Sequence, residues 1–229
     1  MALARTDLVP MTPRQQLQAG RLLRRSAQLA LGLSLYGFSM AMMVRSGLGL
    51  APWDVLHIGL AARLPLTFGE VTVVVGALVL ALWAPLRQWP GFGTIANVVV
   101  IGVVSDLGLA LLSEPISLLS RALLLFGGII LNGIAGGLYI GSQLGPGPRD
   151  GLMTGVARRT GWSLRIVRTG IEVVVLGVGW ALGGVVGIGT IAYAVLIGPI
   201  VHVVLPLVTV ALPQPALASA NGSTTSAPA

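Results

Sequence analysis

Seven polar side chains lie within or beside long apolar stretches of this sequence, where they could form a binding site inside a membrane. They are Asp54, His57, Asn97, Asp106, Asn132, Asp150 and His202. Removing a carboxylate group from water is costly, so acids inside a membrane are commonly paired and line the path of a substrate or ion. The pattern predicts a polar site that binds a small molecule or an ion. For Asn97 or Asn132 taken alone, a purely structural hydrogen bond is slightly favoured.

Two of these acids occupy the same position in a phrase that occurs twice. Residues 46–54 read SGLGLAPWD, and residues 142–150 read SQLGPGPRD. Glycine adopts backbone angles that are closed to other residues, and proline fits the first turn of a helix. Each phrase therefore predicts a loop that leads into a short helix. The loop residues that carry this prediction are Ser46, Gly47, Gly49, Pro52, Ser142, Gly145 and Pro148.

The positions of Asp54 and Asp150 allow two interpretations. Both fall in the first turn of the predicted short helices, 52–64 and 148–160, where a carboxylate group faces free N–H groups and the positive end of the helix dipole. They could therefore cap the helices without binding a ligand. Alternatively, they present charge to a cavity between the helices. We favour the second interpretation narrowly, because both copies of the phrase contain the aspartate.

The elements that must position these residues are membrane helices. The sequence is 55% hydrophobic and only 9% charged, and its mean hydropathy is +0.90, far from the composition of soluble proteins. Six apolar stretches each have about the 20 residues that a helix needs to cross a bilayer. They are 27–44, 71–86, 91–112, 122–141, 169–187 and 188–211. We predict an all-α, polytopic membrane protein.

The sequence also repeats itself at a spacing of 96 residues. Without a gap, 46–107 aligns with 142–203, and GFGTIANVVVIG in the first copy matches GIGTIAYAVLIG in the second. This self-similarity predicts two homologous halves, 27–112 and 122–208. Duplicated halves in membrane proteins typically build transporters, with the binding site between them.

Two topologies fit this repeat. Six transmembrane helices plus two short half-helices give each half three crossings, so that the halves are inverted relative to one another. If the short helices also span, eight transmembrane helices form two parallel repeats. Both topologies place most arginines on the side of the N-terminus, which the positive-inside rule assigns to the cytoplasm. We favour six spans, because glycine, proline and aspartate crowd the disputed stretches.

The chain ends differ from the membrane part. Residues 1–20 and 213–229 are polar, contain several prolines or are low in complexity, which is typical of disorder. We predict a disordered cytoplasmic N-terminus, a single membrane domain over 21–208 and a disordered C-terminal tail. Because the first apolar stretch belongs to the repeat, we expect the mature protein to retain it.

The run from SGLG to PWDVLHIGL, followed by a helix and by GFGTIANVVVIG, resembles the YczE/YitT-like bacterial integral membrane proteins, most closely their YczE branch. The resemblance covers about residues 30–205. It implies a multi-pass protein of the bacterial inner membrane and names no substrate. In the second half PRDGLMTG replaces PWDVLHIG, so the tryptophan and histidine of the first phrase are not repeated.

Several classes of function lack their residues in this sequence. There is no cysteine, and the two histidines lie in unrelated settings, so we expect no metal site and no cofactor. The sequence motifs of serine nucleophiles, of zinc proteases and of phosphate-binding loops are missing, so we expect that the protein is not an enzyme. The net charge of +7 would suggest nucleic acid for a soluble protein. Here the arginines gather at the ends of apolar stretches, which topology explains, so we expect no nucleic-acid partner.

Two functions remain. Duplication, short helices and buried acids favour a small-solute or ion-coupled transporter, a permease with a polar site between two repeats. The alternative is an accessory membrane protein that does not transport and assists the assembly or export of a partner. The expected partners are the lipid bilayer and an unknown small molecule or ion. Glycine ladders suit packing within the chain or, less strongly, a homodimer. Their members are Gly133, Gly137, Gly141, Gly179, Gly183 and Gly187.

Overall fold

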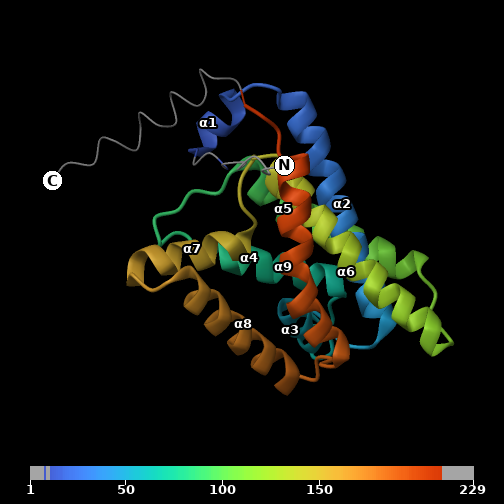
Figure 1. Ribbon diagram of the computed structural model, residues 1–229. Helices are drawn as coiled ribbons and strands as arrows, with labels where there is room; N and C mark the ends of the chain where they lie inside the picture. The colour runs from blue at the N-terminus through green and yellow to red at the C-terminus, as the bar shows by residue number, and fades with distance from the viewer. Residues whose placement is uncertain (1–7, 9–10, 213–229) are drawn as a thin grey trace.

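The computed structural model describes residues 8 and 11–212, and these residues form α-helices and no strand (Figure 1). The all-α prediction is confirmed. In chain order the helices are α1 (Pro13–Gln18), α2 (Leu22–Ser46), α3 (Pro52–Ala61), α4 (Phe68–Ala81), α5 (Phe92–Leu111), α6 (Leu118–Gly141), α7 (Pro148–Thr160), α8 (Leu164–Ala181) and α9 (Ile188–Val208).

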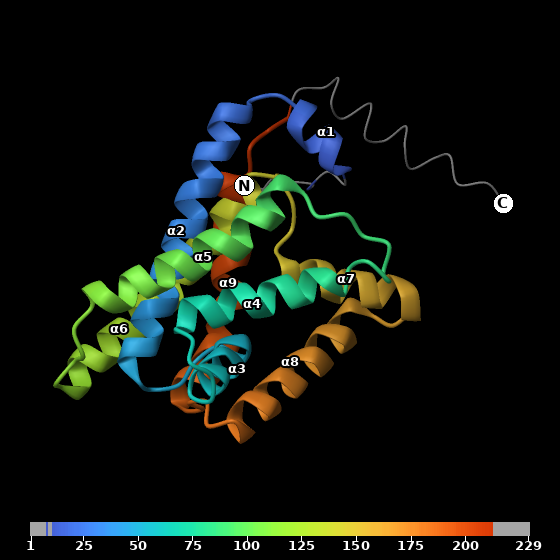
Figure 2. The ribbon, with the colours of Figure 1, turned by 180° about the vertical axis from the view of Figure 1, so that it is seen from behind.

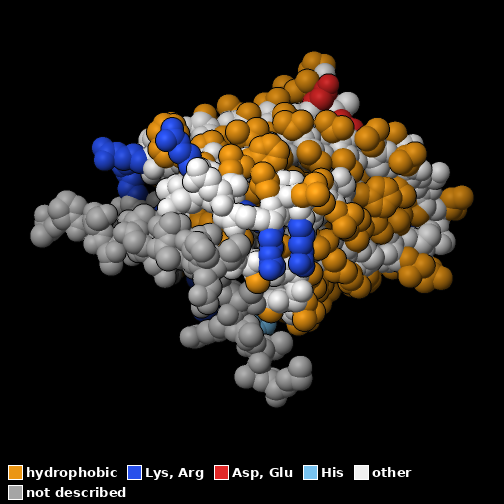
Figure 3. Space-filling view, turned by 90° about the horizontal axis from the view of Figure 1, so that it is seen from above, with side chains coloured by type: hydrophobic (Ala, Val, Ile, Leu, Met, Phe, Trp, Pro, Cys, Tyr) orange, Lys and Arg blue, Asp and Glu red, His pale blue; other side chains and the backbone are white. Residues whose placement is uncertain are grey.

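Four of these helices are long and apolar enough to cross a membrane. They are α2, α5, α6 and α9, with 25, 20, 24 and 21 residues. Of the other two predicted spans, α4 is apolar but has 14 residues, and α8 has 18 residues that include Arg165, Arg168 and Glu172. Seen from the end where α1 lies, much of the surface is hydrophobic (Figure 3). The chain is a polytopic helical membrane protein.

The last four helices follow the order and spacing of the four before them. The equivalent pairs α3 and α7, α4 and α8, and α5 and α9 begin at Pro52 and Pro148, Phe68 and Leu164, and Phe92 and Ile188. Each pair of starts is 96 residues apart, the spacing of the two sequence copies. With 10 and 13 residues, α3 and α7 are short, as predicted for half-helices.

The equivalent helices α2 and α6 pack against each other in opposite directions. A side chain at Gly32, early in α2, would meet Tyr139, late in α6. Reciprocally, a side chain at Gly128, early in α6, would meet Met43, late in α2. Figure 2 shows α5 beside α2, against which it packs. Antiparallel packing of equivalent helices is the geometry that inverted halves require.

Two arginines make reciprocal contacts between the halves. The Arg25 guanidinium, buried near the start of α2, donates from Nε to the carbonyl oxygen of Ser142 (2.8 Å). Arg121, in the first turn of α6, donates from Nε to the carbonyl oxygen of Ser46 (2.7 Å). Each arginine therefore satisfies a carbonyl group left free where the long helix of the other half ends.

The loop before each short helix lies against the other half. Gly93 N–H donates to the carbonyl oxygen of Leu144, and Gly189 N–H donates to that of Leu48, both at 2.8 Å. Gly49 has a φ of +116°, and a side chain there would collide with the backbone just before α9. This close approach requires glycine, which explains its place in the phrase.

The start of α2 lies beside the ends of α6 and α9. The side-chain amide of Gln28 donates to the carbonyl oxygens of Leu138 and Val208, each at 2.9 Å. The membrane part of the chain therefore begins and ends at the same end of the bundle. An even number of crossings gives this arrangement.

The prediction of disorder over residues 1–20 is wrong for the part that forms α1. The Thr12 side chain accepts a hydrogen bond from Gln15 N–H, and the Gln15 side chain accepts one from Thr12 N–H, which makes a capping box. The carbonyl oxygen of Gln16 then accepts a hydrogen bond from Arg25 Nη1 (2.6 Å). Local capping and this buried cation order a segment whose composition is polar. The rest of the predicted disorder, at 1–7, 9–10 and 213–229, lies outside the described residues.

Most of the glycine ladder residues pack within the chain. Gly133, Gly137 and Gly141 of α6 lie against α9 and the residues that follow it, and Gly179 of α8 lies against α3. A Cβ atom added at Gly183 would meet only open space within the described part of the chain. A homodimer would therefore have to use a surface other than the glycine face of α6, because α9 covers that face.

Candidate functional site

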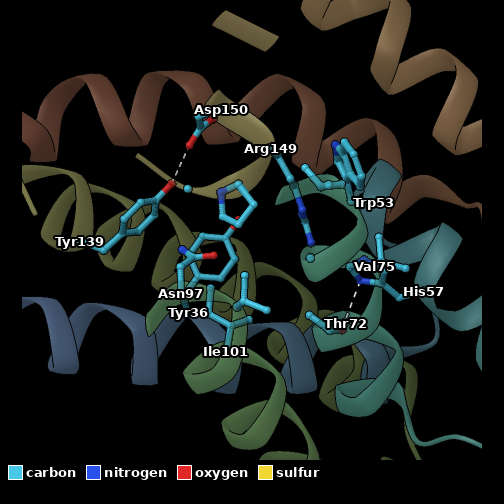
Figure 4. Close-up of a pocket in the computed structure, with 15 residues that line it drawn as sticks. Tyr36, Trp53, His57, Thr72, Val75, Asn97, Ile101, Tyr139, Arg149 and Asp150 are labelled. Carbon is cyan, nitrogen blue, oxygen red and sulfur yellow. Dashed lines mark hydrogen bonds between the residues drawn. The ribbon is translucent and has the colours of Figure 1, made fainter. Parts of the chain in front are cut away.

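A cavity of about 90 Å³ lies where the two short helices meet α4, α5 and the middle of the bundle (Figure 4). Val75, Val98 and Ile101 give it an apolar wall. The polar side chains that line it come from both halves of the chain. They are Tyr36, Trp53, His57, Thr72, Asn97, Tyr139, Arg149 and Asp150.

The starts of α3 and α7 position the charged residues. Pro52 follows the extended Ala51 and occupies the first position of α3, and Pro148 follows the extended Gly147 and does the same in α7. An extended residue followed by proline fixes where a helix begins, since proline lacks the N–H group that a helix start leaves unpaired. The next two residues of each helix, Trp53 with Asp54 and Arg149 with Asp150, are therefore placed in the first turn.

Asp54 of α3 forms an ion pair with Arg149 of α7 across the two halves. The Asp54 Oδ1 atom is 3.7 Å from Arg149 Nη2 and 3.6 Å from His57 Nδ1. Asp54 is only 2% exposed, and its Oδ1 atom has no hydrogen-bond partner among the described residues. A buried carboxylate group is normally held by short hydrogen bonds. The Oδ1 atom of Asp54 instead has two longer contacts, with Arg149 and His57, and can therefore accept a proton or another partner.

Arg149 has unused hydrogen-bond donors that face the cavity. Its guanidinium group lies over the Trp53 ring, 5.0 Å from the ring centre, which is a cation–π contact. A guanidinium group carries five N–H donors, and the hydrogen bonds found in the described chain use none of those of Arg149. The indole N–H of Trp53 is buried and also lacks a partner there. This end of the cavity is rich in donors.

His57 is held by α4. Its Nδ1 atom is 3.3 Å from the Thr72 hydroxyl oxygen, and its ring packs edge-on against Phe68 at 5.9 Å between ring centres. Thr72 donates its own hydroxyl hydrogen to the Phe68 carbonyl oxygen (2.8 Å), so its oxygen accepts from His57. This pattern assigns the imidazole hydrogen to Nδ1.

Asp150 forms the other polar end of the cavity. Its Oδ2 atom accepts a hydrogen bond from the Tyr139 hydroxyl group (2.9 Å). A Cβ atom at Gly147 would lie 3.2 Å from Asp150 Oδ2, 3.3 Å from the Tyr139 hydroxyl oxygen and 3.7 Å from Asn97 Nδ2. The three side chains therefore converge on one glycine. Figure 4 shows Asp150 and Tyr139 on one side, and Arg149, Trp53 and His57 on the other.

Three of the seven predicted polar residues lie elsewhere. Asn132 is buried between α2, α6 and α9, where it donates to the Ser39 hydroxyl oxygen (2.8 Å) and accepts from Tyr193 (3.0 Å). Asp106 accepts hydrogen bonds from the Thr67 hydroxyl group and from Gly69 N–H (2.7 Å), so it caps the start of α4. His202 is exposed on α9. The structure brings together Asp54, His57, Asn97 and Asp150.

The predicted loop residues frame the site. The hydroxyl groups of Ser46 and Ser142 donate to the carbonyl oxygens of Met43 and Tyr139, each at 2.6 Å, where α2 and α6 end. Gly47, Gly49 and Gly145 have positive φ values. Of the two prolines, Pro148 lines the cavity, and its carbonyl oxygen accepts a hydrogen bond from Trp83 Nε1 (3.0 Å). These residues hold the short helices in place.

The sequence interpretation missed the residues that give the cavity its donors. Arg149 carries the strongest signal, because it is an arginine inside a phrase that otherwise has the features of a membrane half-helix. Tyr36 and Tyr139 lie in apolar stretches and gave no pattern of their own. Among the described residues no group of three His, Cys, Asp or Glu side chains could hold a metal ion. The side chains that line the cavity offer a ligand charges and hydrogen-bonding groups.

A family model described as "Family of unknown function (DUF6198)" matches residues 23–206. The chain belongs to this family. An uncharacterized protein of Haemophilus influenzae is 37% identical over 180 residues, which cover 79% of this chain and 83% of the relative. The uncharacterized membrane protein YczE of Bacillus subtilis is 35% identical over 178 residues, which cover 76% of this chain and 82% of YczE.

A third relative, the uncharacterized protein YyaS of Bacillus subtilis, is 28% identical over 183 residues, which cover 78% of this chain and 90% of YyaS. No solved structure matches the chain. The resemblance to the YczE branch is confirmed. The match to YczE over most of both chains supports the assignment to the membrane, in agreement with the long apolar helices.

Proposed function

We propose that this DUF6198 member is a small-solute or ion-coupled transporter of the bacterial inner membrane. One observation carries the proposal: Asp54 and Arg149, from different halves of the chain, place opposite charges 3.7 Å apart beside a cavity inside a membrane protein. Charged groups at such a position are expensive to desolvate and in most cases mark a substrate or ion path.

The arrangement of the helices supports the same function. Two short helices begin at one cavity, and the equivalent long helices α2 and α6 run in opposite directions. Inverted repeats with interrupted helices at a central site are the architecture of many secondary transporters, in which one half moves against the other around the site. We propose that the two halves of this chain are such repeats.

The proposed orientation places both chain ends in the cytoplasm. Arg14, Arg21 and Arg24 precede α2 or lie in its first turn, and Arg158 and Arg159 end α7. The positive-inside rule assigns such groups to the cytoplasmic side. A reporter enzyme that works only outside the cytoplasm, fused after Leu212, should be inactive. High activity of that fusion would contradict the orientation.

The transport proposal is tested by comparing metabolite uptake and efflux in a deletion strain, an overexpressing strain and the parent. We expect at least one solute to change in opposite directions in the first two strains. Complementation by an Arg149→Gln variant, present in the membrane at normal level, should fail, whereas Arg165→Gln on the exposed part of α8 should restore the parent profile. Full complementation by Arg149→Gln would instead favour the accessory function.

A further inference from the structure

We propose that the cavity binds the carboxylate group of a small organic acid through Arg149, and that Asp54 takes up a proton when Arg149 leaves it for the ligand. The inference rests on the proposed transport function and adds its substrate class. It also identifies the coupled ion as a proton, bound together with the acid at one site.

The donors of Arg149 carry the first step. The side chain is 26% exposed, its guanidinium group stacks on Trp53, and its 3.7 Å contact with Asp54 is longer than a normal hydrogen bond. The planar guanidinium fork matches a carboxylate group, with which it forms two parallel charge-assisted hydrogen bonds. A ligand carboxylate would thus offer Arg149 a better partner than the distant Asp54.

The size and lining of the cavity limit the rest of the ligand. A cavity volume of about 90 Å³ suits an acid of a few carbon atoms. Val75 and Ile101 line the same cavity and would contact the hydrocarbon part; Figure 4 shows Val75 to the right of the guanidinium group and Ile101 below it. A cationic ligand fits less well, because the guanidinium group points into this space.

The burial of Asp54 carries the second step. With Arg149 on the ligand, Asp54 Oδ1 keeps the contact with His57 Nδ1, at 3.6 Å, but no cation among the described residues pairs with it. A carboxylate group that is 2% exposed and unpaired is very costly, and protonation removes the charge. The proton goes to the Asp54 carboxyl group, and the ligand brings one negative charge. The total charge of the occupied site is therefore the same as that of the empty one.

The other described groups around Asp54 cannot replace Arg149 as the positive partner of its carboxylate group. Tyr36 of α2 and Tyr193 of α9 interact with its charge but are neutral phenols. On α4 the polar neighbour of the cluster is Thr72, whose hydrogen goes to a backbone carbonyl oxygen. On α8, which also packs on α3, Arg168 and Glu172 pair with each other at 2.9 Å. Asp150 on α7 already accepts a hydrogen bond from Tyr139.

The first experiment compares three probes of nearly equal size on the purified full-length protein: propionate, propionamide and propylammonium, at equal ionic strength in chloride. At about 100 times its Kd, propionate should raise the melting temperature by roughly 5–10 °C. The neutral amide and the amine should leave it unchanged. Equal stabilisation by the amide, by the amine or by added chloride would overturn the proposed carboxylate site.

Variants then test the residue assigned to the carboxylate. Arg149→Gln should abolish the propionate effect, and Arg149→Lys, which keeps the charge but loses the fork, should weaken affinity at least about tenfold. Arg165→Gln, an exposed arginine on α8, should bind as the parent does. Undiminished propionate binding by Arg149→Lys would overturn the assignment even if Arg149→Gln did not fold.

The proton is measured by titration calorimetry of propionate in two buffers with different ionisation enthalpies. The parent should take up about one proton per propionate, and Asp54→Asn should bind propionate without proton uptake. Uptake that persists in Asp54→Asn, or no uptake by the parent, would overturn the role of Asp54.

Transport in proteoliposomes separates this inference from the proposed function. If propionate binds with a proton but proteoliposomes do not move it, the transport proposal fails while the binding site stands. If another solute is transported and propionate does not bind, only this inference fails.

Discussion

The two acids at equivalent positions, Asp54 and Asp150, have different surroundings. Asp54 is buried, has no normal hydrogen bond at Oδ1 among the described residues and is paired with Arg149 at 3.7 Å. Asp150 is partly exposed and accepts a hydrogen bond from Tyr139. The backbone around them is alike, with a loop, a proline and the first turn of a short helix. The difference therefore comes from the neighbouring side chains. Because of it, the charge of Asp54 depends on Arg149, whereas Asp150 already has a hydrogen-bond donor.

The same comparison explains the substitutions between the copies. Arg149 takes the place of Trp53, so the guanidinium group of one helix stacks on the indole ring at the same position of the other. His57, which contacts both Asp54 and Thr72, is replaced by Met153 in the second copy. The two short helices begin alike, but equivalent positions in them carry side chains of different charge.

The largest expected effect on stability comes from removing the cation beside Asp54. Arg149→Gln should lower the free energy of unfolding by about 3 kcal/mol, near the lower end for a buried ion pair that loses one partner, because Asp54 can take up a proton. Adding Asp54→Asn should restore a large part of this loss. Denaturant unfolding in detergent measures both. A double variant as unstable as Arg149→Gln would show that the pair does not interact.

A smaller effect is expected at the other acid. Tyr139→Phe removes the donor to Asp150 and should cost about 1.5–2 kcal/mol, the lower part of the range for a hydrogen bond to a charged group. Propionate binding should stay within about threefold of the parent, since the donors assigned to the ligand remain. Loss of propionate binding in Tyr139→Phe, with normal folding, would show that both ends of the cavity bind the carboxylate group.

The smallest effect is expected from Asp150→Asn. The amide oxygen can still accept the hydrogen bond from Tyr139, so only the dipole contribution of about 0.3–1 kcal/mol is lost. Thermal unfolding beside the parent measures this. A loss as large as that of Arg149→Gln would mean that the charge of Asp150, and not its hydrogen bond, stabilises the site.

Much of the fold follows from local features of the sequence. Pro52 and Pro148 begin the short helices as predicted, and the apolar stretches become helices in the predicted order. The helix at Pro13–Gln18 was missed because its capping box and its contact with Arg25 are specific interactions inside a polar composition. The ends of α4 and α8 also differ from the apolar stretches, since capping by Thr67 and Ser163 starts both helices earlier.

The site could be predicted only in part. Asp54, His57, Asn97 and Asp150 were found because polar groups in apolar surroundings are conspicuous. Which of them meet depends on packing, and Arg149 enters the cluster because two short helices begin at the same cavity.

Asp106 and His202 show the same limit. They occupy equivalent positions, but α4 packs along α5, whereas α8 packs on α3 instead of along α9. Asp106 therefore caps a helix, and His202 stays exposed. Equivalence in sequence did not predict equivalent surroundings.

The most direct test of the account is to express Asp54→Asn, Asp150→Asn and the double variant in the deletion strain and to score the deletion phenotype beside the amount of protein in the membrane. We predict that Asp54→Asn and the double variant reach the normal membrane level and lose function, while Asp150→Asn keeps most of it. Full function of the double variant at normal level would contradict the account, because both acids would then serve only to begin their helices.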